Sequence, residues 1–187
     1  MACLILASSS PRRKEIMKMM GIPFDIIEPE TEEIIGTDED PNDLVSRLAC
    51  MKASDVYERA GKGHIVVGID TIVCIDGLVL GKPHDRCDAY AMLKRLSGRT
   101  HKVLSGVCIM EDKTAPISFV SETEVTFADM SDNEIDEYVD TKEPYDKAGA
   151  YGIQGKAAKF IKSIKGCYYN VMGLPLSEVY GIIKNII

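Results

Sequence analysis

The chain has 187 residues, of which 45% are hydrophobic and 27% are charged, and it contains no Trp. This is the composition of an ordinary globular protein, long enough for one large domain or two small lobes. The 22 basic and 29 acidic residues give a net charge of −7. This charge argues against a nucleic-acid partner bound through bulk electrostatics, so a phosphate ligand would need a local basic cluster.

The cysteines and the apolar runs indicate the compartment. Six cysteines are scattered along the chain without a CxxC pair, and Cys3, Cys74 and Cys108 lie in apolar runs. This pattern is typical of reduced thiols in a cytosolic protein and not of a disulfide framework or a zinc site. No run approaches the ~18 apolar residues of a membrane span, and no leader is recognisable. We therefore expect a soluble, cytoplasmic protein without a membrane partner.

The first segment predicts a strand that leads into a helix. Leu4–Ala7 is a short apolar run that predicts a buried strand. Ser10 is a good N-cap and a proline follows it, which predicts a helix over about 11–20. Arg12 and Arg13 lie in the first turn beside hydroxyl groups, where free backbone N–H groups bind anions. This stretch alone fits a phosphate site and a solvated charged turn equally well.

The next segments supply acidic and basic candidates. Phe24–Glu28 predicts a strand, and the acidic segment 28–43 after it contains Glu33, a candidate metal or water ligand. A solvated acidic loop is the simpler explanation of any single glutamate in that segment. A helix is expected over 41–60. Lys52 lies at the boundary of the inward face of this helix, where most lysines are only solvated.

The most strand-like run of the chain contains an aspartate. A strand is expected over 64–75, and Asp70 interrupts its β-branched residues. Burying a carboxylate without a partner is costly, which favours a functional role for this residue. Asp76-Gly77 is a strong two-residue hairpin turn. The chain then returns through Leu78–Leu80 and could bring Lys82 back near Asp70.

The second half predicts further regular elements and one unusual loop. The local patterns predict a helix over 85–97 and strands over 102–110 and 117–127. They also predict a capping-box helix over about 131–140, a hairpin of strands 160–164 and 167–171, and a C-terminal helix from 174. Between these elements, the segment EPYDKAGAYGIQG begins at Glu143. Its glycines indicate tight turns or close backbone approach.

At this point the sequence resembles the Maf proteins, a family of nucleoside triphosphate pyrophosphatases. The motifs that carry the resemblance are SSSPRRKE, GIDTIV, GKP, LSGRTHKVLSGV, EPYDKAGAYGIQG and YYNVMGLPL, in the family's order and over almost the whole chain. The resemblance implies an α/β fold, in which an elongated, mixed and twisted β-sheet is flanked by helices, as in Maf and ITPase-like proteins. It implies a single Maf-like domain over 1–187 with two lobes around a deep cleft, and a cytoplasmic enzyme that is often a homodimer.

The resemblance also implies a reaction. A nucleoside triphosphate would be cleaved between its α and β phosphates to a monophosphate and pyrophosphate, with Mg²⁺ or Mn²⁺ as cofactor. By matching position, Asp70 would be the proton acceptor that activates water and a ligand of the metal, and Glu33 would help hold the metal or the water. Lys82 would act with Asp70 at the reacting phosphates. The residues that would contact the triphosphate are Ser8, Arg12, Arg13, Lys52 and Lys82.

Three positions resemble the branch of the family that is specific for dTTP and UTP. They are Arg12, Thr71 and Gln154. A glutamine presents both a donor and an acceptor, which suits the O4 and N3–H edge of thymine or uracil. One departure is Ile69, where the family more often has Ala, and it should change packing beneath Asp70 without touching the chemistry. The sequence leaves open whether the target is standard dTTP and UTP or modified pyrimidine triphosphates.

A second hypothesis comes from a different class of function. Maf relatives are linked to inhibition of septum formation, so this chain could act as a regulatory protein through partner binding, with or without turnover. The acidic loop and the C-terminal helix would serve such contacts. Partner binding that depends on nucleotide without turnover would favour this alternative.

Overall fold

The computed structural model describes residues 3–31 and 39–187, which form an α/β fold around a mixed sheet. In this part of the chain the strand order is β2-β1-β3-β5-β6-β7, and β4 pairs with β3. The strands are β1 (Cys3–Ala7), β2 (Phe24–Ile27), β3 (His64–Ile75), β4 (Leu78–Leu80), β5 (Thr100–Met110), β6 (Ile117–Phe127) and β7 (Ile161–Lys165). The expected fold class is therefore confirmed.

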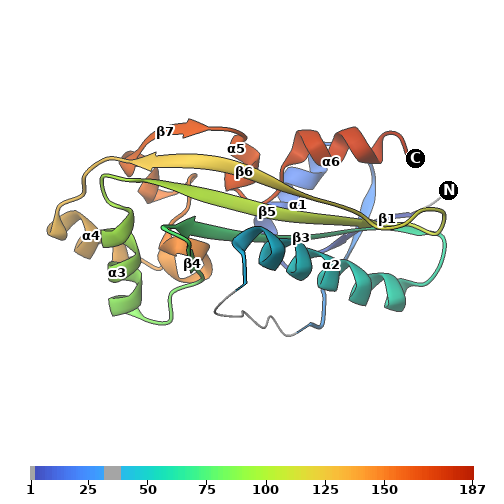
Figure 1. Ribbon diagram of the computed structural model, residues 1–187, viewed down its shortest axis with the longest axis horizontal. Coiled ribbons are helices and arrows are strands. Elements are labelled where there is room, and N and C mark those ends of the chain that lie inside the picture. The colour runs from blue at the N-terminus through green and yellow to red at the C-terminus, as the bar shows by residue number, and fades with distance from the viewer. Residues whose placement is uncertain (1–2, 32–38) are drawn as a thin grey trace. The chain divides into compact units, whose positions relative to one another are not determined.

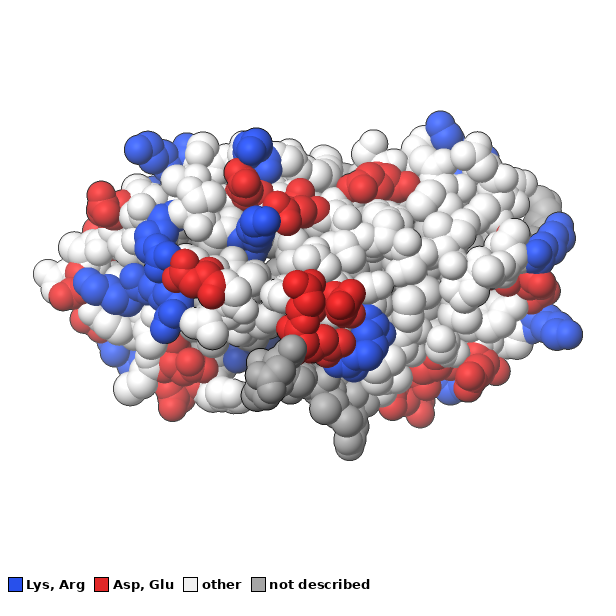
Figure 2. All heavy atoms as spheres, in the orientation of Figure 1, with Lys and Arg blue, Asp and Glu red and all other residues white. Residues whose placement is uncertain are grey.

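The α-helices are α1 (Pro11–Lys18), α2 (Pro41–Ala60), α3 (Arg86–Leu96), α4 (Asp132–Val139), α5 (Tyr168–Val171) and α6 (Leu176–Ile183). Three short 3₁₀ turns follow α4, namely η1 (Pro144–Asp146), η2 (Ala148–Ala150) and η3 (Lys156–Phe160). No helix within the described ranges is long and apolar enough to cross a membrane. Basic and acidic side chains are interspersed on the face drawn in Figure 2.

The chain divides into two compact units. The first unit comprises Met1–Asp70, Ser105–Ser121 and Gly173–Ile187, and the second comprises Thr71–Leu104 and Glu122–Met172. Strands β3, β5 and β6 each contribute residues to both units. This division agrees with the two lobes that the resemblance implies.

In the first unit, α2 lies against the sheet at van der Waals distance. Strand β1 runs parallel to β2 and β3, and Ala7 pairs with Ile27 on one side and Gly68 on the other. A Cβ built on Gly106 of β5 would lie 2.5 Å from the carbonyl carbon of Val45 on α2, so only glycine fits there. Figure 1 shows α2 and α6 on different sides of these strands.

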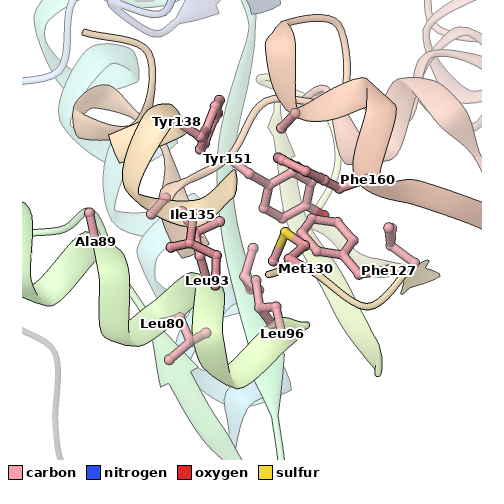
Figure 3. Close-up of a cluster of buried hydrophobic side chains, with 14 of the residues drawn as sticks. Leu80, Ala89, Leu93, Leu96, Phe127, Met130, Ile135, Tyr138, Tyr151 and Phe160 are labelled. Atoms are coloured by element: carbon pink, nitrogen blue, oxygen red, sulfur yellow. The ribbon is translucent and has the colours of Figure 1, made fainter. Parts of the chain in front are cut away.

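In the second unit, local turn and capping signals fix the ends of the elements. Asp76 and Gly77 both have positive φ, 54° and 76°, as a two-residue type I′ hairpin turn between β3 and β4 requires. Ser131 and Glu134 form the capping box that starts α4. Helices α3 and α4 pack over a core that also contains the rings of β6, η3 and the chain after η2 (Figure 3).

The prediction of a last hairpin is wrong in its second strand. Residues Ile161–Lys165 do form β7, which pairs antiparallel with β6, but Tyr168–Val171 is the short helix α5. Asn170 is fully buried, and its Nδ2 donates to the Val103 carbonyl oxygen at 3.1 Å and to Thr123 Oγ1 at 3.0 Å. The helical turn carries this amide to its buried acceptors, and these long-range hydrogen bonds override the strand-like local pattern.

Candidate active site

The turn between β1 and α1 brings two of the candidate residues together. Ser8 is buried, and its Oγ accepts hydrogen bonds from the backbone N–H of Ser10 at 3.2 Å and from Arg13 Nη1 at 3.4 Å. Arg13 Nε also donates to the Gly173 carbonyl oxygen at 2.8 Å. The guanidinium is therefore held at the helix N-terminus by two acceptors. Arg12 is half-buried in the same first turn.

The second feature of the first unit is a buried ion pair. Lys52 Nζ lies 2.5 Å from Asp70 Oδ1, and each residue is only 7% exposed. Lys52 belongs to the fourth turn of α2 and Asp70 to the middle of β3. A buried carboxylate requires a partner, and here an ammonium group provides both opposite charge and a hydrogen bond. The cost of burying Asp70, expected from the sequence, is offset by Lys52.

Strand alternation explains why these two side chains meet. Residues two apart in a strand face the same side, so Asp70 shares the face of Gly68. A Cβ built on Gly68 would lie 2.6 Å from the backbone nitrogen of Ala53, so α2 packs directly on this glycine. Lys52 precedes Ala53 on the helix, and the glycine thus lets α2 approach closely enough for the ammonium to reach the carboxylate.

In the second unit, Lys82 follows the β3–β4 hairpin. Its side chain is exposed, and Thr71, the first residue of this unit, is half-buried. The Gly149 backbone N–H donates to the Gly81 carbonyl oxygen at 3.0 Å. Gly149 has φ +68° and lies against Val73, where a Cβ would come within 3.0 Å of both methyl groups. The GKP segment is thus tied to the glycine-rich loop.

Gln154 lies in a tight turn of that loop. Its side chain is exposed, whereas Tyr151 and Ile153 before it are buried. The Gly155 N–H donates to the Gly152 carbonyl oxygen at 3.1 Å, which closes the turn around Ile153 and Gln154. The turn therefore presents the amide of Gln154 to its surroundings while its apolar neighbours anchor the loop.

A buried histidine supports the same loop. His101 is 2% exposed, and its Nε2 lies 2.8 Å from Tyr151 Oη, while its ring contacts Tyr151 and Phe127 edge to face. Burial lowers the pKa of His101 to about 4 and raises the pKa of Tyr151. His101 is therefore neutral at pH 7 and contacts Tyr151, whose ring lies in the core drawn in Figure 3.

The depressed pKa of His101 makes stability depend on pH. Above pH 6.5 the residue is neutral in both the folded and the unfolded state, so it does not make the free energy of unfolding depend on pH. Below pH 6.5 the unfolded chain binds a proton that the folded chain excludes, so stability falls until the folded pKa of about 4 is reached. From the two pKa values, we expect a loss of about 2 kcal/mol between pH 7 and pH 5. Urea unfolding at several pH values measures it.

The control for this prediction is a histidine on the surface. His101→Gln should remove this part of the pH dependence because Gln does not titrate, whereas His84→Gln, at an exposed position, should leave it unchanged. An equally steep loss of stability in His101→Gln and wild type would contradict the assignment to His101.

One expected ligand lies outside the described part of the chain. Glu33 belongs to residues 32–38, which are not described. Within residues 3–31 and 39–187, no three His, Cys, Asp or Glu side chains form a group that could hold a metal ion. Asp70 is the expected metal ligand that the structure describes, and Lys52 contacts one of its two oxygens.

Comparison with known proteins decides the family. The family profile described as "Maf-like protein" matches residues 3–186. The chain belongs to the Maf family. Two relatives, both named dTTP/UTP pyrophosphatase, come from Bacillus anthracis (strain CDC 684 / NRRL 3495) and Bacillus cereus (strain AH820). Each is 50% identical over 182 residues, which is 97% of this chain and 94% of the relative.

Solved structures support the fold of this Maf chain. A HAM1 protein from Coxiella burnetii matches with a TM-score of 0.59 at 15% identity, over 99% of this chain and 100% of that one. The Ham1 protein of Staphylococcus aureus matches with a TM-score of 0.54 at 10% identity, over 98% and 99%. At such low identity these matches show a common fold and nothing finer.

Sequence reasoning missed two glycines that shape the site. Gly68 and Gly106 each interrupt a run of strand-forming residues, and each lies against the backbone of α2. An isolated glycine within a strand pattern is a signal of close backbone approach. That signal was present in the HIVVGID and KVLSGVCI segments and could have located the helix that carries Lys52.

Proposed function

We propose that this Maf protein hydrolyses dTTP and UTP to the monophosphate and pyrophosphate. The names of relatives that are 50% identical over 97% of the chain support this substrate class. The structural observation that carries the proposal is the buried Lys52–Asp70 pair, which lies in the same compact unit as the turn at Ser8 and Arg13, whose cation and helix N-terminus suit a phosphate. A carboxylate base and a site for phosphate charge are the two requirements of the reaction.

In the proposed reaction, water attacks the α-phosphorus and the bond from that phosphorus to the αβ-bridging oxygen breaks. The proton of the attacking water passes to Asp70, whose Oδ1 is oriented by Lys52. Pyrophosphate leaves with the bridging oxygen. The base is held in one rotamer by its partner, which reduces the cost of orienting it during the reaction.

The cationic side chains would stabilise the triphosphate. Arg13 is pre-oriented by Ser8 and by the Gly173 carbonyl, so its fork would bind phosphate oxygens with little loss of entropy. We propose the same type of contact for Arg12 and Lys82. Thr71, Arg12 and Gln154 would set the preference for dTTP and UTP.

A divalent metal fits this set of donors. Mg²⁺ commonly uses one or two carboxylates together with substrate phosphates and water, so Asp70, with Glu33 as a second ligand, would hold it. When bound, the metal would neutralise phosphate charge and make water easier to deprotonate. Mn²⁺ would serve in the same way. We also propose that residues 1–187 act as one Maf domain, in a cytoplasmic homodimer.

The test is pyrophosphate release from a panel of nucleotides. The purified protein is incubated with dTTP, UTP, dCTP, dATP and dGTP, with Mg²⁺ or Mn²⁺, and pyrophosphate and phosphate are measured separately. We expect pyrophosphate from dTTP and UTP and little from the others, with the monophosphate as the second product. Release of phosphate without pyrophosphate, or no release by folded protein, would contradict the proposal and favour the regulatory function.

A further inference from the structure

The base of the Gln154 turn is built from two charged side chains of the preceding segment. The turn is bracketed by Gly152 and Gly155. A Cβ on Gly152 would lie 2.7 Å from Lys147 Cε, and a Cβ on Gly155 would lie 2.5 Å from Glu143 Oε2. Side chains from Glu143 and Lys147 thus lie where a Cβ at either glycine would project, so a larger residue there would displace them.

Glu143 links this turn to helix α4. Its Oε2 accepts a hydrogen bond from the Lys156 N–H at 2.9 Å, directly after Gly155, and its Oε1 accepts one from Tyr138 Oη at 3.0 Å. Lys147 Nζ donates to the Glu143 carbonyl oxygen at 2.6 Å. Burial and the Glu143 contact raise the pKa of Tyr138, so its hydroxyl stays a donor.

The anchor of this contact is buried and packed against another ring. Tyr138 is 3% exposed within the core of the second unit, and its ring meets Phe160 edge to face at 6.1 Å (Figure 3). One carboxylate therefore connects a fixed tyrosine to the backbone two residues after Gln154. Because a hydrogen bond to a base demands an accurately placed donor and acceptor, loosening this connection would weaken discrimination between bases.

We propose that Glu143 is a positioning residue for nucleotide discrimination, which acts through the turn that carries Gln154. This inference rests on the proposed function. Discrimination between bases is measured as the ratio of kcat/KM for dTTP to kcat/KM for dCTP. The bases of these two nucleotides carry opposite donor and acceptor patterns on their pairing edges. Glu143→Ala should lower this ratio roughly tenfold, the equivalent of one hydrogen bond, chiefly through a higher KM for dTTP.

Two further variants separate positioning from folding. In Glu143→Gln the single amide oxygen can accept from the Lys156 N–H, but the amide nitrogen then faces the donating Tyr138 hydroxyl, so the ratio should fall by less than in Glu143→Ala. Gly155→Ala keeps every charge but pushes a methyl group against the carboxylate, and it should lower the ratio as Glu143→Ala does. If Glu143→Ala does not fold, Gly155→Ala alone tests whether Glu143 positions the turn.

A double variant tests whether the effect passes through Gln154. In a Gln154→Ala background, Glu143→Ala should cause no further loss of the ratio. Glu137→Ala, at an exposed position of α4, is the control and should match wild type. An unchanged ratio in Glu143→Ala or Gly155→Ala, or an undiminished loss in the Gln154→Ala background, would overturn the inference. Absence of pyrophosphate release from both nucleotides by wild type would overturn the proposed function and this inference with it.

Discussion

Replacing Asp70 with Asn is expected to lower kcat for dTTP hydrolysis by about 10²–10⁴-fold, the usual contribution of a general base. The amide has nearly the same shape as the carboxylate but cannot accept the proton of the attacking water. Continuous measurement of pyrophosphate release gives kcat and KM together. Because the loss is one of proton transfer, KM for dTTP should change far less than kcat.

Loss of the negative charge also affects folding, and this effect must be separated from catalysis. Asp70→Asn leaves the Lys52 ammonium buried without its counter-ion, and breaking a buried pair in this way costs roughly 3–5 kcal/mol. The double variant Lys52→Met/Asp70→Asn removes both charges and should recover most of this stability but none of the activity. Asp43→Asn, at an exposed position of α2, is the matched control. Substantial turnover by folded Asp70→Asn would exclude Asp70 as the base.

Local signals in the sequence were sufficient to predict most of the elements. The capping box at Ser131 and Glu134 and the Asp76-Gly77 turn each involve residues a few positions apart, so the sequence contains both partners. The expected helix over 41–60 matches α2 as observed. These predictions succeeded because their physical causes lie within one turn of the chain.

Where a feature depends on residues far apart in the sequence, local patterns predict it wrongly or do not predict it. Helix α5 depends on buried partners of Asn170 that lie 47 and 67 positions earlier, so its local pattern predicts a strand instead. Lys52 likewise looked like an ordinary boundary lysine, because Asp70 is 18 residues away. Only the resemblance to the Maf family singled it out. The approach of Lys82 to Asp70, expected from the hairpin, stays a prediction.

The close contact of Gly68 with α2, which makes this pairing possible, should be sensitive to a single added methyl group. Gly68→Ala places a Cβ 2.6 Å from the backbone nitrogen of Ala53 and 2.8 Å from its Cβ. Neither neighbour can rotate away as a flexible side chain would, so α2 must shift from β3. We expect a loss of about 3 kcal/mol in the free energy of unfolding, near the upper end for overpacking. The midpoint of thermal unfolding, Tm, should fall by roughly 6–12 °C.

The same shift should also reduce activity, because it moves Lys52 away from Asp70 and leaves the carboxylate without the partner that orients it. Gly181→Ala tests whether any added methyl group has this effect, since a Cβ at Gly181 in α6 would meet nothing within 4 Å. That control should match or exceed wild-type stability, because alanine favours a helix interior over glycine. If Gly68→Ala kept both the stability and the dTTP turnover of wild type, close approach of α2 would not be what holds the base in place.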